Sequence, residues 1–152
     1  MMRWHVRTAR CSSMFVAGVL IMGAAAPDRA PFFHERKEVA GLAIVFGAEP
    51  EPALHEEIQF LRWRVSTLGN DAPYTALAGA EVRITRTGED FGPYPLRAVR
   101  GTPGQYEPRH IFPEPGAYGS VLSFKKGEEQ TVHTVDFAFT INDRADIEIP
   151  GQ

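Results

Sequence analysis

Residues 101–124, GTPGQYEPRHIFPEPGAYGSVLSF, contain two strand-like runs, and each run follows a turn rich in proline and glycine. The first turn is built on Pro103 and Gly104, and the second on Pro115 and Gly116. Proline presets the φ angle of the first turn position, and glycine accepts the positive φ that follows. The stretch therefore predicts neighbouring strands of an antiparallel β-sheet.

Alternating side chains predict further strands on both sides of this stretch. In residues 57–66, EIQFLRWRVS, apolar and charged residues alternate from Leu61 onward, which indicates a strand with one buried and one solvated face. Ile58 and Phe60 have the opposite phase, so we expect a β-bulge near Phe60. The other predicted strands are residues 41–46, 80–87, 96–100, 105–112, 117–124 and 131–141.

This pattern of short strands separated by Gly/Pro turns is typical of an all-β domain. We expect an immunoglobulin-like antiparallel β-sandwich of about seven strands over residues 39–141, with a small β-barrel as the alternative. Trp63 lies where such folds often keep a core tryptophan, and Tyr118 resembles the tyrosine at the corner before a late strand. Residues 142–152 are expected to be a polar tail that frays.

The N-terminus has the pattern of a secretory signal. Residues 1–13 carry three arginines, and residues 14–26, MFVAGVLIMGAAA, are uncharged and end in small side chains. As a helix this apolar run would rise about 20 Å, less than the roughly 30 Å hydrocarbon core of a bilayer. We therefore expect residues 1–26 to be a cleaved signal helix, with an uncleaved membrane anchor as the alternative. Residues 27–38 are expected to be a flexible lead-in.

Export to the periplasm or the cell exterior, with cleavage of the signal, would remove the sulfur-containing residues that several kinds of chemistry require. The single cysteine, Cys11, and all four methionines lie in the predicted signal, so the mature chain would have no disulfide, thiol nucleophile or sulfur metal ligand. Without residues 1–26 the chain carries 13 basic and 19 acidic residues, a net charge of −6. We expect no nucleic-acid partner, because phosphate binding needs clustered positive charge. Membrane contact is expected only through an uncleaved signal.

Three short motifs occur in an informative order: GAEV at residues 79–82, GQY at residues 104–106 and PGAY at residues 115–118. In this order they resemble small exported bacterial Ig-like domains of the YtkA-like kind, over residues 39–141. The resemblance implies an exported β-sandwich with an accessory or binding role, and it carries over no catalytic residue. Some related sandwich proteins handle copper through histidines and methionines, and the absence of methionine from the predicted mature chain argues against that role here.

Four histidines would remain after cleavage, and none of them forms a tightly spaced ligand pair. Ligands can converge from distant strands, so spacing alone leaves a copper or zinc site open. For such a site we expect His34 and His110 as ligands, with His133 third. The alternative is that these histidines are unrelated residues at the surface or at the edge of the core, and that no cofactor is bound.

The acidic residues do not predict a catalytic centre. Some of them form adjacent pairs, namely Glu56-Glu57, Glu89-Asp90 and Glu128-Glu129, and neighbours on a strand point to opposite faces of its sheet. General acid–base catalysis requires convergent, partly buried carboxylates. The chain also lacks a Gly-x-Ser-x-Gly elbow and a glycine-rich phosphate loop. We therefore expect no enzymatic activity.

Arginine is the only basic residue type between positions 62 and 109. We expect Arg62, Arg64 and Arg83 to point outward and to form one basic sheet face, which would dock an acidic protein or cell-envelope component. The alternative is that these arginines form cross-strand ion pairs of small energy with Glu57, Glu81 or Glu107.

Residues 88–95, GEDFGPYP, are expected to be a loop that carries Phe91 and Tyr94. Aromatic side chains on a loop can anchor a binding partner. They can equally fold back over the core. The sequence thus predicts a non-enzymatic exported interaction or accessory module, and a periplasmic metal-handling protein is the alternative.

Overall fold

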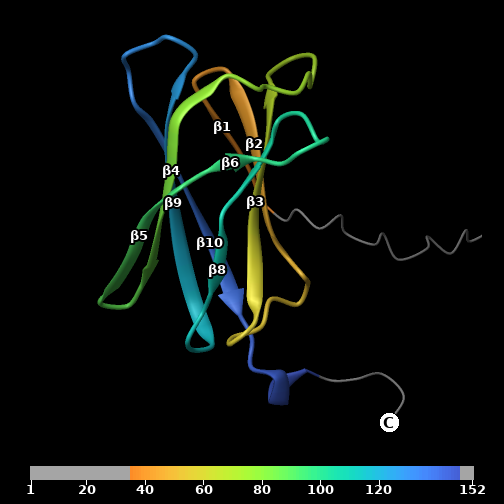
Figure 1. Cartoon of the computed structure of the whole chain (residues 1–152), viewed down its shortest axis with the longest axis vertical. Helices are drawn as coiled ribbons and strands as arrows, with labels where there is room; N and C mark the ends of the chain where they lie inside the picture. Colours follow the sequence, from red (N-terminus) through yellow and green to blue (C-terminus); the bar gives the residue numbers. More distant parts are fainter. Residues whose placement is uncertain (1–34, 148–152) are drawn as a thin grey trace, which may run out of the picture.

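The computed structural model describes residues 35–147, which form two antiparallel β-sheets (Figure 1). The predicted signal helix at residues 1–26 and His34 lie outside the described residues. The strands are β1 (Glu35–Val39), β2 (Leu42–Glu49), β3 (Ile58–Thr67), β4 (Leu77–Arg86), β5 (Glu89–Pro95), β6 (Arg97–Ala98), β7 (Gln105–Glu107), β8 (Arg109–Ile111), β9 (Gly116–Lys126) and β10 (His133–Ile141).

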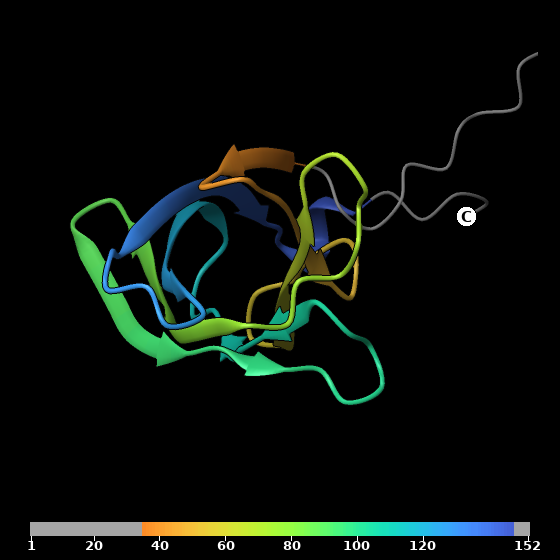
Figure 2. The same ribbon diagram turned by 90° about the horizontal axis from the view of Figure 1, so that it is seen from above.

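Sheet 1 has the strand order β1-β2-β3-β7-β6, and β8 also pairs with β3. Sheet 2 has the order β10-β9-β4-β5. The chain crosses from one sheet to the other after β3, β5 and β8, so each sheet combines strands that are distant in sequence. The sheets enclose a common interior (Figure 2), which confirms the prediction of an all-β domain and is consistent with a sandwich.

The core lies between the sheets and is rich in aromatic residues. In β3 the buried side chains are Leu61, Trp63 and Val65, as the alternation predicts. The Phe46 ring packs against both layers: its centroid lies 5.1 Å from that of Trp63 in sheet 1 and 5.2 Å from that of Phe137 in sheet 2. These contacts between sheets bury the apolar face of each one.

The predicted bulge in β3 is wrong. The register is regular along the strand, from Phe60 opposite Glu49 to Thr67 opposite Leu42. In this regular register the side chain of Gln59 is buried, on the same face as Leu61 and Trp63. Its amide donates a hydrogen bond to the Leu54 carbonyl at 3.0 Å. A hydrogen bond of this kind lets a polar side chain enter the interior. Ile58 and Phe60 therefore remain on the outer face.

The lead-in predicted at residues 27–38 is wrong for its last four residues, because Glu35–Val39 is the edge strand β1. Its side chains alternate between half-buried and exposed, but charged residues occupy most of both sets and conceal the strand pattern. The Lys37 ammonium lies 3.1 Å from the Asp136 carboxylate in β10. Burial lowers the pKa of Lys37, but the hydrogen bonds and charges of Asp136 and Glu35 together raise it above its ordinary value. This contact joins β1 to the edge of sheet 2 (Figure 2).

Residues 35–147 form ten strands, whereas about seven were predicted. The expected loop at residues 88–95 is largely the edge strand β5, where Pro93 and Pro95 are tolerated because an edge position leaves ladder donors unused. The run predicted at residues 105–112 is divided into β7 and β8 at Pro108. Both differences between the predicted and the observed strands occur at prolines.

The predicted fraying tail is wrong for residues 142–147. The Asn142 N–H donates to the Ala53 carbonyl at 2.8 Å, and its side-chain amide donates to the same oxygen at 3.1 Å. The 3₁₀ helix η1 (Arg144–Asp146) follows, and the Asp143 carboxylate caps it by accepting from the Ala145 N–H at 2.9 Å. No helix within residues 35–147 is long and apolar enough to span a bilayer.

Candidate interaction surface

The predicted basic face does not form, because its three arginines lie on different sheets. Arg62 and Arg64 extend from β3 in sheet 1, whereas Arg83 belongs to β4 in sheet 2. The chain crosses between the sheets after β3, so the outer faces of β3 and β4 look in opposite directions. The alternation of side chains correctly predicted that these arginines point outward, but it did not predict which sheet each of them belongs to.

Ion pairs neutralise Arg62 and Arg83. The Arg62 guanidinium contacts the Glu107 carboxylate at 3.0 Å and also pairs with Glu49. Arg83 lies 3.7 Å from Asp90 across the β4–β5 hairpin. The alternative of cross-strand ion pairing is therefore confirmed for Arg62 and Glu107. Arg64 is exposed on the outer face of sheet 1.

An apolar patch lies beside Arg62 on the outer face of sheet 1. Ile58 and Ile111 are direct cross-strand partners, and they are 54% and 55% exposed. Phe60 lies next to them, and the Arg109 guanidinium carbon stacks 5.2 Å from its ring centroid. Isolated exposed apolar residues are ordinary, but contiguous ones beside arginine and an aromatic ring are typical of protein interfaces. We call Ile58, Phe60, Arg109 and Ile111 the isoleucine patch.

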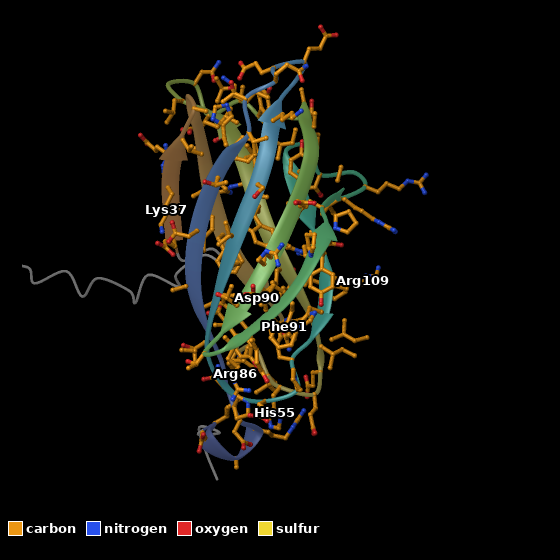
Figure 3. All side chains as sticks on the ribbon, turned by 90° about the vertical axis from the view of Figure 1, so that its left-hand side faces the viewer. Lys37, His55, Arg86, Asp90, Phe91 and Arg109 are labelled. Atoms are coloured by element: carbon orange, nitrogen blue, oxygen red, sulfur yellow. The ribbon has the colours of Figure 1, made fainter. Side chains whose placement is uncertain are left out.

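A groove of about 560 Å³ adjoins the isoleucine patch at Arg109. It runs between β5 at the edge of sheet 2 and strands β6 to β8 of sheet 1, and Figure 3 shows Arg109 on this side of the molecule. We call it the arginine groove. Its lining residues are Tyr94, Pro95, Arg97, Ala98, Val99, Arg100, Glu107, Pro108 and Arg109.

Phe91 and Tyr94 fold back onto the domain from β5. Their ring centroids lie 5.7 Å and 5.2 Å from that of His110, which in turn lies 4.6 Å from the buried Phe112. Both side chains are half-buried and pack against the core, which favours the fold-back alternative over two free anchors. His110 thus links β5 of sheet 2 to β8 of sheet 1 through ring contacts.

The environment of His110 favours the neutral imidazole. The side chain is half-buried among aromatic rings, and its Nε2 atom is buried without a hydrogen-bond partner. This desolvation lowers the pKa of His110 below its ordinary value of 6.5. Protonation would place an uncompensated charge between the two sheets.

Domain stability is expected to fall as the pH drops below about 6.5, because the unfolded chain then takes up a proton that folded His110 resists. The contribution is fully present above the pKa of the unfolded histidine and is lost between that value and the lower pKa of the folded protein. The measurement is urea unfolding of the parent and of His110→Phe at several pH values. The comparison isolates the contribution of His110 to the pH dependence of stability, because phenylalanine keeps an aromatic ring but does not titrate. An identical pH dependence in the two proteins would assign the loss to other groups.

Among the described residues, His110 and His133 do not come together in a metal centre. His110 lies on β8 in sheet 1, and His133 begins β10 in sheet 2. The His133 Nε2 atom lies 3.4 Å from the Glu129 carboxylate, and its ring packs 5.7 Å from Phe124. No group of three His, Cys, Asp or Glu side chains among residues 35–147 is placed to hold a metal ion. Because His34 lies outside the described residues, its role stays a prediction.

Neither the arginine groove nor the isoleucine patch was predicted from the sequence. Arg97 and Arg100 are two of the arginines between positions 62 and 109, and no motif distinguishes them from the others. Ile58 lies in the run for which a bulge was predicted, and Ile111 lies in the predicted strand at residues 105–112. Only the register that sets Ile58 opposite Ile111 and Phe60 opposite Arg109 brings the patch together.

Comparison of the chain with protein-family models, with curated proteins and with solved structures gave no match.

Proposed function

We propose that this protein is an exported, non-enzymatic interaction module that binds a protein partner through the isoleucine patch. The cross-strand pair of Ile58 and Ile111 carries the proposal, because both side chains are more than half exposed on an ordered sheet face. Arg109 stacked on Phe60 supplies the arginine–aromatic combination that is enriched in binding hot spots. Export is supported by the basic, apolar and small-residue order of residues 1–26.

The scaffold that we propose is an immunoglobulin-like sandwich with an added N-terminal strand, β1. If β7 and β8 are taken together as strand E, the orders β2-β3-β7-β6 and β10-β9-β4-β5 correspond to A-B-E-D and G-F-C-C′. The Tyr118 hydroxyl donates to the Glu114 carbonyl at 2.8 Å at the start of β9, as in the tyrosine corner of such folds. In this reading the isoleucine patch lies on the A-B-E-D sheet.

The double substitution Ile58→Thr with Ile111→Thr is expected to weaken partner binding by about tenfold to a hundredfold, since hot-spot truncations typically cost a few kcal/mol. Threonine retains the β-branched shape that suits a strand, so folding is expected to persist. The measurement is capture by immobilised mature domain from an extract of the organism that encodes it. Mass spectrometry would identify the captured proteins, and titration of each purified candidate would give its affinity.

Val132→Thr is the matched control, because Val132 is 58% exposed outside the isoleucine patch. A partner that is retained by the parent and by Val132→Thr, but lost with the double variant, supports the proposal. A partner retained equally by all three proteins would rule out the isoleucine patch as its binding surface. Circular dichroism melts establish that the variants are folded.

A further inference from the structure

The arginine groove concentrates positive charge that the domain does not neutralise. Within residues 35–147 none of Arg97, Arg100 and Arg109 forms an ion pair. Ion pairs are formed by Arg36, Arg62, Arg83, Arg86 and Arg144. The acid in the groove lining, Glu107, is held by Arg62 at 3.0 Å. The same residues 35–147 carry 12 basic and 17 acidic side chains, so this cluster lies on a domain of net charge −5.

The groove is built from restrained elements. Pro108 is buried between β7 and β8, and Pro95 ends β5 on the opposite wall. Tyr94 on that wall is half-buried and packs 5.2 Å from the His110 ring. Arg109 is held over Phe60. Walls fixed in this way reduce the ordering cost of binding.

We propose that the arginine groove binds an acidic, extended segment of the protein partner, with side-chain carboxylates paired to Arg97, Arg100 and Arg109. The proposal rests on the proposed function, because Arg109 belongs to both the isoleucine patch and the groove. Guanidinium groups match carboxylates through paired, charge-assisted hydrogen bonds. β6 is the edge strand of sheet 1, so an extended chain lying there also meets unpaired backbone groups of Arg97–Ala98.

A polypeptide fits the two neighbouring surfaces better than other polyanions. The isoleucine patch requires apolar side chains, which an acidic polysaccharide lacks. An anionic bilayer is nearly flat at this scale, whereas the arginine groove is concave, and the net charge of −5 on residues 35–147 opposes approach to such a surface. An acidic peptide segment satisfies both the charge and the shape.

The test uses the mature protein and a fluorescein-labelled peptide of about ten glutamates, which spans about 33 Å when extended. Anisotropy titrations at low salt compare the parent with the triple variant Arg97→Ser, Arg100→Ser and Arg109→Ser. Binding is expected to weaken by at least about tenfold in the triple variant. It is also expected to weaken in the parent as salt rises to about 150 mM.

A second triple variant removes the same amount of charge outside the groove: Arg36→Ser, Lys125→Ser and Arg144→Ser. When the titrations are run at about 100 mM salt, we expect its affinity to stay within about twofold of the parent, because the Debye length is then about 10 Å and charges farther from the groove are screened. Equal losses in the two triple variants would overturn the proposal, since net charge alone would then explain binding. Absence of peptide binding by the parent would overturn it too.

Sedimentation with phosphatidylglycerol–phosphatidylcholine vesicles is the second arm. Groove-dependent binding to vesicles without binding to the glutamate peptide would replace the acidic segment with a membrane surface. The result for the arginine groove can be distinguished from the result for the isoleucine patch. The peptide titration measures charge recognition by the arginine groove, because polyglutamate offers no apolar side chain to the isoleucine patch. Partner capture by the Ile58→Thr, Ile111→Thr protein measures the contribution of the patch.

Discussion

Trp63→Ala is expected to lower the free energy of unfolding by about 3–5 kcal/mol, the usual cost of removing a large buried aromatic side chain. Trp63 has no exposed surface and stands at the centre of β3, between Phe46 on one neighbouring strand and Tyr106 on the other. Its ring centroid lies 5.1 Å from that of Phe46, which also contacts sheet 2. The cavity would therefore open where the sheets meet, and relaxation could fill it only in part.

Trp63→Phe provides the comparison for this prediction, and we expect it to cost less than half as much. The indole Nε1 atom is buried without a hydrogen-bond partner, a penalty of about 1–3 kcal/mol that phenylalanine removes. Removal of this penalty partly offsets the free-energy cost of the smaller cavity that Trp63→Phe leaves. Urea unfolding should be followed by circular dichroism, because the other tryptophan, Trp4, lies in the predicted signal. A loss below about 1.5 kcal/mol for Trp63→Ala would contradict the central role assigned to this side chain.

Gly104→Ala is expected to lower the free energy of unfolding by about 2–4 kcal/mol, through backbone strain and overpacking. Gly104 has φ of 75°, a left-handed conformation that disfavours a side chain. A Cβ atom there would lie 2.6 Å from the Val65 carbonyl oxygen and 3.0 Å from the Pro73 Cβ atom. The Val65 N–H also donates to the Gly104 carbonyl at 2.7 Å, so the turn cannot move away without losing that bond.

Gly101→Ala separates these two causes. Gly101 has φ of 83°, but a Cβ atom built there has no neighbour within 4 Å. Only the left-handed penalty of about 1–2 kcal/mol remains at that position. Equal losses at Gly101 and Gly104, measured by the same urea titrations, would show that the contact with Val65 is relieved at no cost.

Neither the isoleucine patch nor the arginine groove was predicted from the sequence, and the predicted basic face was correct only in the direction of its side chains. The outward direction of Arg62 follows from alternation with Leu61 and Trp63, since successive side chains on a strand point to opposite faces. Its ion pair with Glu107 needs the pairing of β3 with the β7–β8 segment, which joins residues 45 positions apart. Turn chemistry correctly placed the strands near Gly104 and Gly116, because φ preferences act within a few residues.

By itself the sequence determined which residues form the main strands and which face of each strand is buried. β3 and β10 follow their alternation because that pattern depends only on local strand geometry. The tertiary structure decided which strands share a sheet, and with it the separation of Arg62 from Arg83 and the pairing of Ile58 with Ile111. It also ordered the charged segment Glu35–Val39, whose Lys37 is stabilised by Asp136 on a strand at the other end of the chain. Those outcomes depend on contacts between residues that are far apart in the sequence. The sequence around one residue of such a pair does not identify the other.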